Sequence, residues 1–299
     1  MSKRETIGGT IGLWTGALEA QAPTRLGEIA TEVQELGYAS LWFGEAWGRE
    51  ALTQASLLLA GSSDLTIGTG IANIYARDAA ASANGGRLLA GAFDDRFVLG
   101  LGVSHKPLVE RLRGHEYASP IETMKAYLEA MDAVPYLSAG PPEQAPRVLA
   151  ALGPKMLSLA ATAADGAHPY LVTPEHTAFA RETMGPDSLL IVEQAVALVD
   201  DEDEYVRRAH EHLNIYTGLP NYRNSWKRQG FTEDDFGRGG SRRLKDAMVV
   251  WGDETKVKAR VQAHLDAGAD QVLLQVLGAD LNDLPSGDWA RLAAALVSR

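Results

Sequence analysis

The sequence has no cysteine and fewer basic than acidic residues, and both features limit the functions that the protein can have. Without cysteine, the 299-residue chain cannot form disulfides, thiolate nucleophiles, iron–sulfur clusters or cysteine-ligated zinc. Its 28 Lys and Arg residues stand against 39 Asp and Glu, which gives a formal net charge of −11. Such a chain repels a phosphate backbone, and no dense basic run with interleaved aromatics offsets this, so we expect no nucleic-acid partner.

Long apolar runs are also missing. No stretch approaches the roughly 20 apolar residues that span a bilayer, and the N-terminal segment lacks a charged start followed by an apolar run. We therefore expect a cytoplasmic protein without a membrane partner. The remaining composition, with 45% hydrophobic and 22% charged residues, is ordinary for a globular protein and allows a sizeable core.

What the sequence does contain is a recurring unit: an amphipathic helix, a glycine able to cap it in the left-handed conformation, and a short β-rich run. Four copies have their glycines at Gly37, Gly91, Gly166 and Gly268, followed by strand candidates at residues 39–43, 97–101, 169–172 and 271–276. Four further strand candidates, each followed by a helical segment, lie at residues 9–14, 65–70, 147–152 and 189–198. Eight such units without a Gly-x-Gly-x-x-Gly motif favour a closed (β/α)8 barrel over a doubly wound sheet. We predict that residues 1–299 form this barrel as one domain.

The repeating pattern breaks between residues 218 and 240. This segment is rich in aromatic residues, contains Arg223, Lys227 and Arg228, and ends in an Asp- and Gly-rich stretch. Long segments outside the main pattern are usually lids, binding loops or disordered chain, and the aromatic and basic content argues against disorder. We interpret the segment as an insertion that acts as a lid.

Two residues just after strands are our candidates for proton transfer, because barrel enzymes build their active sites at the carboxyl ends of the strands. His105 follows the fourth strand, and an imidazole gives or takes a proton near neutral pH. Glu45 follows the second strand, where the apolar neighbours Phe43 and Trp47 favour a proton-transferring carboxyl by desolvation. The structural alternatives are a packed histidine and a carboxylate that caps the next helix.

A candidate anion site follows the fifth strand. Gly153-Pro154-Lys155 combines free backbone N–H groups at a helix start with a cation, the arrangement that receives a phosphate or carboxylate. Proline in the first turn is equally a plain helix start. Arg77, before the third helix, and the basic residues of the insertion add positive charge to a strongly acidic protein. Solvated surface charge explains each of these singly, and together they indicate an anionic cofactor.

The histidines give no metal motif. His210 and His212 are two apart on a predicted helix and so point to different faces, and no Gly-x-Ser-x-Gly elbow occurs. His168, near the end of the sixth strand, contacts either the substrate or the core, and the residues alone leave both open. We assign the substrate side of the barrel mouth to Trp14, Trp47, His168 and Tyr170.

One set of patterns runs through essentially the whole chain, at residues 36–42, 65–71, 77–90, 95–102 and 267–272. Together these segments resemble the bacterial luciferase-like monooxygenase family. The stretches 43–46 and 173–176 are similar to the branch of that family that uses the deazaflavin coenzyme F420.

The resemblance implies a non-prolyl cis peptide at Gly70-Ile71 that backs the cofactor ring, and a cofactor phosphate at Gly153, Pro154 and Lys155. It also implies a homodimer. We assign three further residues near the strand ends to the cofactor: Asn73, Arg77 and Ser104.

The activity that the resemblance implies is hydride transfer between F420 and a small organic substrate, with His105 and Glu45 in proton transfer. The sugar-phosphate dehydrogenase relatives end strand two in Asp-His and strand four in Glu, where this chain has Gly44-Glu45 and Ser104-His105. This departure argues against the same sugar substrate. Two alternatives use the same fold: a monooxygenase that activates oxygen with reduced FMN, and a barrel that binds a cofactor without catalysis. The polar groups at several strand ends argue against the second alternative.

Overall fold

The computed structural model describes residues 3–46, 48–140 and 143–297 of the chain. Its strands are β1 (Ile11–Trp14), β2 (Ser40–Phe43), β3 (Thr66–Thr69), β4 (Ala72–Asn73), β5 (Phe97–Gly102), β6 (Arg147–Leu149), β7 (Gly166–Ala167), β8 (Leu189–Ala197), β9 (Val249–Trp251) and β10 (Gln271–Val276). Its α-helices are α1 (Lys3–Thr6), α2 (Leu26–Glu35), α3 (Ala51–Ala60), α4 (Ala79–Ala92), α5 (Pro120–Asp132), α6 (Pro154–Ala163), α7 (Pro174–Met184), α8 (Glu202–Leu213), α9 (Pro220–Arg228), α10 (Arg242–Met248), α11 (Glu254–Asp266) and α12 (Ser286–Leu296). Shorter helical turns are η1 (Ala17–Ala20), η2 (Pro23–Arg25), η3 (Leu108–Leu112), η4 (Tyr216–Gly218) and η5 (Glu233–Phe236).

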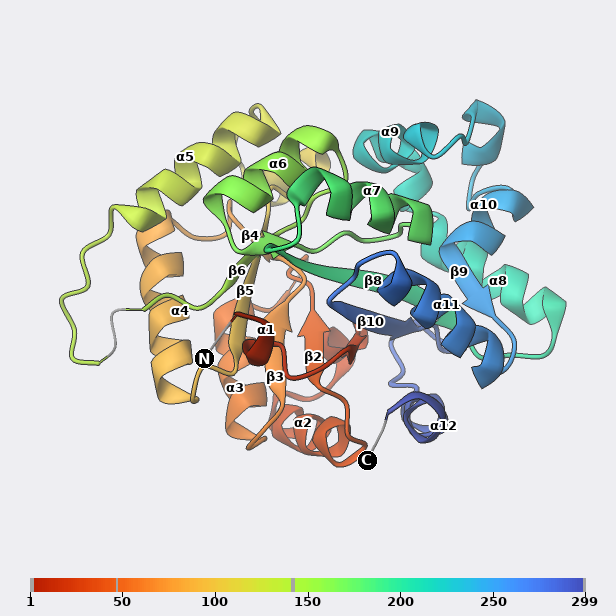
Figure 1. Cartoon of the computed structure of the whole chain (residues 1–299), viewed down its shortest axis with the longest axis horizontal. Coiled ribbons are helices and arrows are strands. Elements are labelled where there is room, and N and C mark those ends of the chain that lie inside the picture. The colour runs from red at the N-terminus through yellow and green to blue at the C-terminus, as the bar shows by residue number, and fades with distance from the viewer. Residues whose placement is uncertain (1–2, 47, 141–142, 298–299) are drawn as a thin grey trace.

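Eight parallel strands of the described chain close into a barrel. They pair in the order β10-β1-β2-β3-β5-β6-β7-β8, and β8 pairs again with β10 to complete the ring. Helices surround the strands on the outside (Figure 1). The predicted (β/α)8 barrel is therefore confirmed. Among the described helices, none has the length and apolar character needed to cross a membrane.

Local sequence sets where the helices begin and end. Several helices begin at a residue whose side chain accepts a hydrogen bond from the first turn: Glu50, Asp78, Thr173, Asp201, Ser241 and Asp253. Gly37 and Gly268, with φ of +86° and +100°, follow α2 and α11 as predicted. The predicted cap at Gly91 is wrong. That residue lies inside α4, and the chain turns at Asp94 and Asp95, which both have positive φ.

The sixth barrel strand is shorter and earlier than predicted. In β7, Gly166 pairs with Val148 on one side and with Leu189 on the other. A Cβ on Gly166 would lie 2.1 Å from the backbone oxygen of Leu189. This position therefore requires glycine in the strand itself, not as a helix cap, and the two-residue strand carries no apolar run for a pattern to detect. The predicted strand at residues 169–172 is a loop, with Leu171 at φ +54°.

The barrel interior is filled by its own cluster of side chains. Trp42 is completely buried there with Val98, Val148 and Ile191. Gly68 of β3 makes the space, because a Cβ on this residue would lie 2.3 Å from the Trp42 ring. A larger cluster packs the outer face of the strands against the helices. Since the middle of the barrel is packed, a ligand site belongs at an end of the strands.

The segment at residues 218–240 is ordered structure. It folds into α9 and η5, and Tyr222, Trp226, Phe231 and Phe236 form a second core with residues of α8 and α10. The break in the sequence pattern therefore marks short packed helices in place of an irregular loop. An additional strand, β9, pairs with β8 outside the barrel ring.

Candidate active site

Three predicted site residues meet at the carboxyl ends of β1, β3 and β7. Trp14 donates from Nε1 to the carbonyl oxygen of Gly70 at 3.1 Å. A Cβ on Gly70 would lie 2.5 Å from Trp14 Nε1 and 2.8 Å from His168 Nε2, so glycine is the residue that fits between them. The Gly70–Ile71 peptide bond is cis, as the family resemblance implies.

The neighbouring strand is shaped to accept the end of β3. Gly100 and Gly102 of β5 leave the space: Cβ atoms there would lie 1.8 Å from the Thr69 oxygen and 2.5 Å from the Ile71 side chain. The alternating glycines of β5 therefore let Thr69 and Ile71 lie directly on it. This contact holds Gly70 and Ile71 in place while both stay half-buried.

Glu45 is held by three donors. Its Oε2 accepts from Asn73 N at 2.8 Å, its Oε1 accepts from Ala51 N at 3.2 Å, and Arg77 forms an ion pair with it. Glu45 is 7% exposed, and Arg77 also pairs with Glu50 at 2.6 Å. The structure thus brings Glu45, Asn73 and Arg77 together. The bond to Ala51, the first residue of α3, is the contact that the capping alternative requires. The two carboxylates, Glu45 and Glu50, share the single positive charge of Arg77.

His105 lies half-buried just after β5, preceded by Ser104 at φ +56°. Its ring centroid is 6.0 Å from that of Tyr222 in α9. Burial lowers the pKa of His105, so its imidazole is neutral at pH 7 and can accept a proton. The 218–240 segment therefore contacts one of the two predicted proton-transfer residues.

An aromatic cluster surrounds Tyr170. Its hydroxyl donates to Gln275 Oε1 at 2.6 Å and accepts from the Tyr216 hydroxyl at 3.2 Å. The Tyr170 ring lies 5.3 Å from that of Trp14 and 6.3 Å from that of Tyr222. Trp14 and Tyr170, both predicted from the sequence, are thus neighbours. Tyr216 and Tyr222 were missed, because their position depends on how α9 folds back. The predicted substrate residue Trp47 lies outside the described residues.

His168 is packed on one side and free on the other. It is 2% exposed, its Nδ1 bonds the Ile191 oxygen at 2.9 Å, and its Nε2 has no hydrogen-bond partner among the described residues. Burial lowers the pKa of His168 to about 4, so the ring is neutral at pH 7. Because Nδ1 faces a carbonyl it carries the hydrogen, which leaves Nε2 as an acceptor beside Gly70.

A small cavity of about 210 Å³ adjoins the N-terminus of α6 and is lined by Glu175, His176, Phe179, Arg228 and Gln229. Arg228 donates to the Leu152 oxygen at 3.0 Å, and a Cβ on Gly153 would lie 3.4 Å from its guanidinium. No side chain caps α6 at Gly153, and Pro154 occupies the first turn. With the exposed Lys155, these residues form a cationic helix start.

Glu193 is a buried acid that the sequence analysis missed. It lies in the middle of β8 with 0% exposure. Its Oε2 accepts from Leu171 N at 2.9 Å, while its Oε1 has no partner among the described residues. Burial raises the pKa of Glu193 to about 8. The signal that could have found it is a lone acid in an otherwise uncharged strand.

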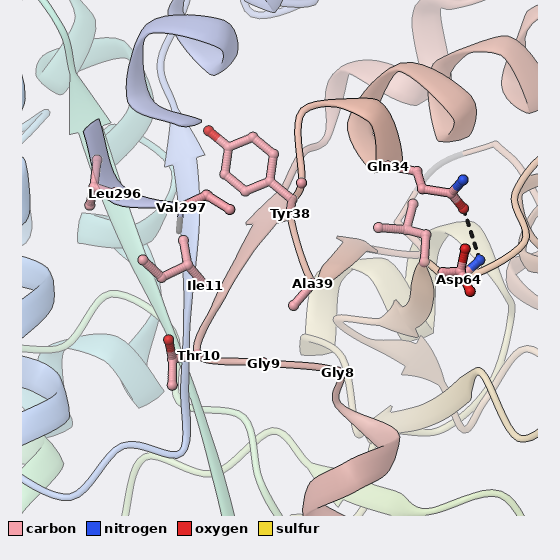
Figure 2. A pocket seen from close by; sticks show the side chains of 12 residues that line it. Gly8, Gly9, Thr10, Ile11, Gln34, Tyr38, Ala39, Asp64, Leu296 and Val297 are labelled. Atoms are coloured by element: carbon pink, nitrogen blue, oxygen red, sulfur yellow. Dashed lines mark hydrogen bonds between the residues drawn. The ribbon is translucent and has the colours of Figure 1, made fainter. Parts of the chain in front are cut away.

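A larger cavity, of about 610 Å³, lies at the amino ends of β1, β2 and β3 (Figure 2). Polar groups in its lining have partners: Gln34 Oε1 accepts from Asp64 N at 2.8 Å, and the Tyr38 hydroxyl donates to the Trp289 oxygen at 2.8 Å. Because barrel enzymes place their chemistry at the opposite, carboxyl ends of the strands, we locate the candidate active site around Gly70, His105 and Tyr170.

A family model of luciferase-like monooxygenases matches residues 9–271. The chain belongs to this family. The resemblance found in the sequence is thereby confirmed, and the protein is an enzyme. The matched region includes seven of the eight barrel strands in full and only the first residue of β10.

Similar proteins contain two different cofactors. A relative from Mycobacterium tuberculosis, named as a coenzyme F420-dependent oxidoreductase, is 28% identical over 194 residues, covering 55% of this chain and 56% of that protein. The chain thus spans about half the length of this relative. An F420-dependent secondary alcohol dehydrogenase, solved with an F420–acetone adduct, has a TM-score of 0.77 at 13% identity, covering 96% of this chain and 98% of the other. A type II Baeyer–Villiger monooxygenase from Pseudomonas putida, solved with FMN, has a TM-score of 0.68 at 14% identity, covering 96% of both.

Proposed function

We propose that the protein is an oxidoreductase that transfers a hydride between coenzyme F420 and a small organic substrate. The observation that carries the proposal is the close approach of Gly70 to Trp14 and to the Nε2 of His168, which has no hydrogen-bond partner among the described residues. Glycine at position 70 lets Trp14 and His168 pack directly on the backbone and leaves no side chain there, and a buried acceptor atom borders it, so the residues fit a flat cofactor ring with polar edges. Similarity to F420-dependent proteins supports the choice of cofactor.

The cationic start of α6 would hold the anionic part of the cofactor. Gly153 and Pro154 leave the first N–H groups of the helix without a side-chain cap, and Arg228 lies against Gly153. Lys155 has no ion pair among the described residues. Arg223 and Lys227, by contrast, both pair with Glu233. Arg228 and Lys155 are therefore the cations that we assign to this role.

Residues of this chain would transfer the proton and exclude water from the site. A bound deazaflavin supplies a carbon that donates or accepts a hydride. Reduction of a carbonyl to an alcohol needs one hydride and one proton, and we assign delivery or uptake of that proton to His105. Glu45 would assist by fixing Asn73 and Arg77, and Ser104 by placing His105. Trp14, His168 and Tyr170 would form the substrate wall and exclude water.

Titration of the purified protein with F420 and, separately, with FMN tests the cofactor assignment by fluorescence. Tight binding of F420 alone supports the proposal, and binding of neither contradicts it. His105→Ala should lower turnover roughly 100-fold or more while F420 affinity stays within about twofold, because general acid–base catalysis contributes about that much. His210→Ala, in α8, is the matched control. Equal loss of turnover and affinity in His105→Ala would refute the role of His105.

The alternative function is oxygen activation by reduced FMN, which the similarity to an FMN-containing monooxygenase favours. Oxygen consumption that depends on reduced FMN and on substrate would establish it in place of hydride transfer. The proposal also includes a cytoplasmic homodimer. Light scattering on the purified protein measures the molar mass that tests the dimer.

A further inference from the structure

Glu193 is tied to the loop that carries Tyr170 by two bonds. Its backbone N–H donates to the Pro169 oxygen at 3.1 Å, and its side-chain Oε2 accepts from Leu171 N at 2.9 Å. The residue between these contacts is Tyr170. One residue of a rigid barrel strand therefore fixes both sides of the tyrosine.

The Leu171 turn needs this support. Leu171 has φ +54°, a left-handed conformation that residues other than glycine adopt only at a cost in free energy. Its carbonyl oxygen accepts from Trp226 Nε1 at 3.1 Å, so Glu193 and Trp226 hold the peptide groups on either side of its Cα. Beyond the turn, Tyr170 lies against Trp14, which in turn bonds the Gly70 oxygen. The chain of contacts thus leads from Glu193 to the proposed cofactor site.

The surroundings of Glu193 favour its uncharged form. The side chain is fully buried, and no Lys, Arg or His pairs with it in the described part of the chain. The titratable groups that face it are Tyr170, Tyr216 and Tyr222, and its charge would raise the pKa of each. A carboxylate in such a place would keep one hydrogen bond, from Leu171 N, but would have no counter-charge to offset its lost hydration.

Other charged or titratable groups near β8 do not change this balance. His168 and His212 belong to the same cluster, and burial lowers the pKa of each to about 4, so both are neutral at pH 7. Arg260 bonds Gln194 Oε1, and successive residues of a strand point to opposite faces. The guanidinium therefore lies on the other side of β8 from the Glu193 side chain.

We propose that Glu193 is a positioning residue: as an uncharged carboxylic acid it fixes the Leu171 turn and thereby Tyr170 beside Trp14 and Gly70. This inference rests on the proposed function only in taking the carboxyl end of the barrel as the active site. An ionised Glu193 would still accept from Leu171 N, but it would be a buried charge without a counter-charge, which favours opening of the turn to water. The turn should therefore open more readily as the pH rises from about 4.5 towards about 8, the ordinary and the folded pKa of Glu193.

Hydrogen–deuterium exchange of peptides that cover residues 168–173 measures the turn without cofactor or substrate. Relative to Glu193→Gln at the same pH, exchange in wild type should rise at least roughly tenfold between pH 5 and pH 8, because opening of the turn hydrates and ionises a Glu193 that the closed turn keeps uncharged. Glu193→Leu, which has no acceptor for Leu171 N, should exchange fast at both values. Glu182→Gln, at an exposed position of α7, should behave as wild type.

Kinetics supply the second readout. Glu193→Gln should keep kcat and KM near the wild-type values at pH 5 and abolish the rise in KM that wild type shows towards pH 8. An unchanged ratio of exchange between wild type and Glu193→Gln from pH 5 to pH 8 would overturn the inference, even if Glu193→Leu fails to fold. Failure of wild type to bind F420 would refute the proposed function instead, and the exchange result would stand.

Discussion

Replacing Glu193 by glutamine should change how the stability of the folded chain depends on pH. In the unfolded chain the glutamate titrates near its usual 4.5, and burial raises its pKa to about 8 in the folded state. A group whose pKa is raised by folding stabilises fully below its unfolded value, and this stability is lost as the pH rises towards its folded value. Glutamine has the same shape without a titrating proton. The stability of the variant should therefore not fall with pH in this way.

The size of the effect follows from the two pKa values. Each unit of difference corresponds to about 1.36 kcal/mol once the pH exceeds the lower value. Between pH 5 and pH 7 the free energy of unfolding of wild type should therefore fall by about 2.5 kcal/mol relative to Glu193→Gln. The gap should widen by only about 1 to 1.5 kcal/mol more above pH 7, because the folded protein then releases the proton as well.

Urea unfolding at pH 5, 6, 7 and 8 measures this difference, with equal m-values as the check that both proteins unfold alike. The buried histidines also titrate in this range, but they are common to both proteins and cancel in the difference. Glu182→Gln should give a curve parallel to wild type. Parallel curves for wild type and Glu193→Gln would show that Glu193 is already ionised when folded, and the argument for an uncharged acid would fail.

Two further predictions concern the cofactor. Gly70→Ala should weaken F420 binding at least about tenfold, because its Cβ would lie 2.5 Å from Trp14 Nε1, whereas Gly218→Ala, with no atom within 4 Å of the new Cβ, should bind normally in the same fluorescence titration. Arg228→Ala should weaken F420 binding by roughly five- to tenfold and reduce its dependence on salt, because one cation is removed from the start of α6. Lys227→Ala should leave both unchanged, since Lys227 pairs with Glu233.

The barrel could be predicted because its strands alternate with helices, and most strands carry an apolar run. The exception shows the limit of that signal. β7 has two residues, and Gly166 is required there by the backbone of Leu189, which lies 23 positions further along the chain. No local pattern records such a contact. The apolar run at residues 169–172 was the stronger local signal, and it belongs to the loop that follows.

The location of the candidate site could be inferred from the sequence because the topology places the carboxyl ends of all barrel strands on one face. The hydrogen-bond and ion-pair partners of each side chain could not be predicted in this way. Glu45 meets Asn73 N and Arg77 only once β2 and β3 lie side by side. Glu193 could have been detected as a single acid among eight uncharged residues of β8. It was missed because a mostly apolar strand is typical of the barrel core and gives no direct sign of a functional residue.

The two ends of the site differ in charge, and this difference bears on the substrate. The start of α6 gathers Arg228 and Lys155, while no Lys or Arg bonds or stacks on Trp14, Tyr170 or Tyr216 within residues 3–46, 48–140 and 143–297. With Glu193 and His168 uncharged at pH 7, an ionised substrate at the aromatic end would lose hydration without gaining a counter-charge. A neutral ketone or alcohol has no such cost, and its oxygen can bond a neutral imidazole. Under the proposed function we therefore expect neutral carbonyl compounds and alcohols to be preferred at this end of the candidate site.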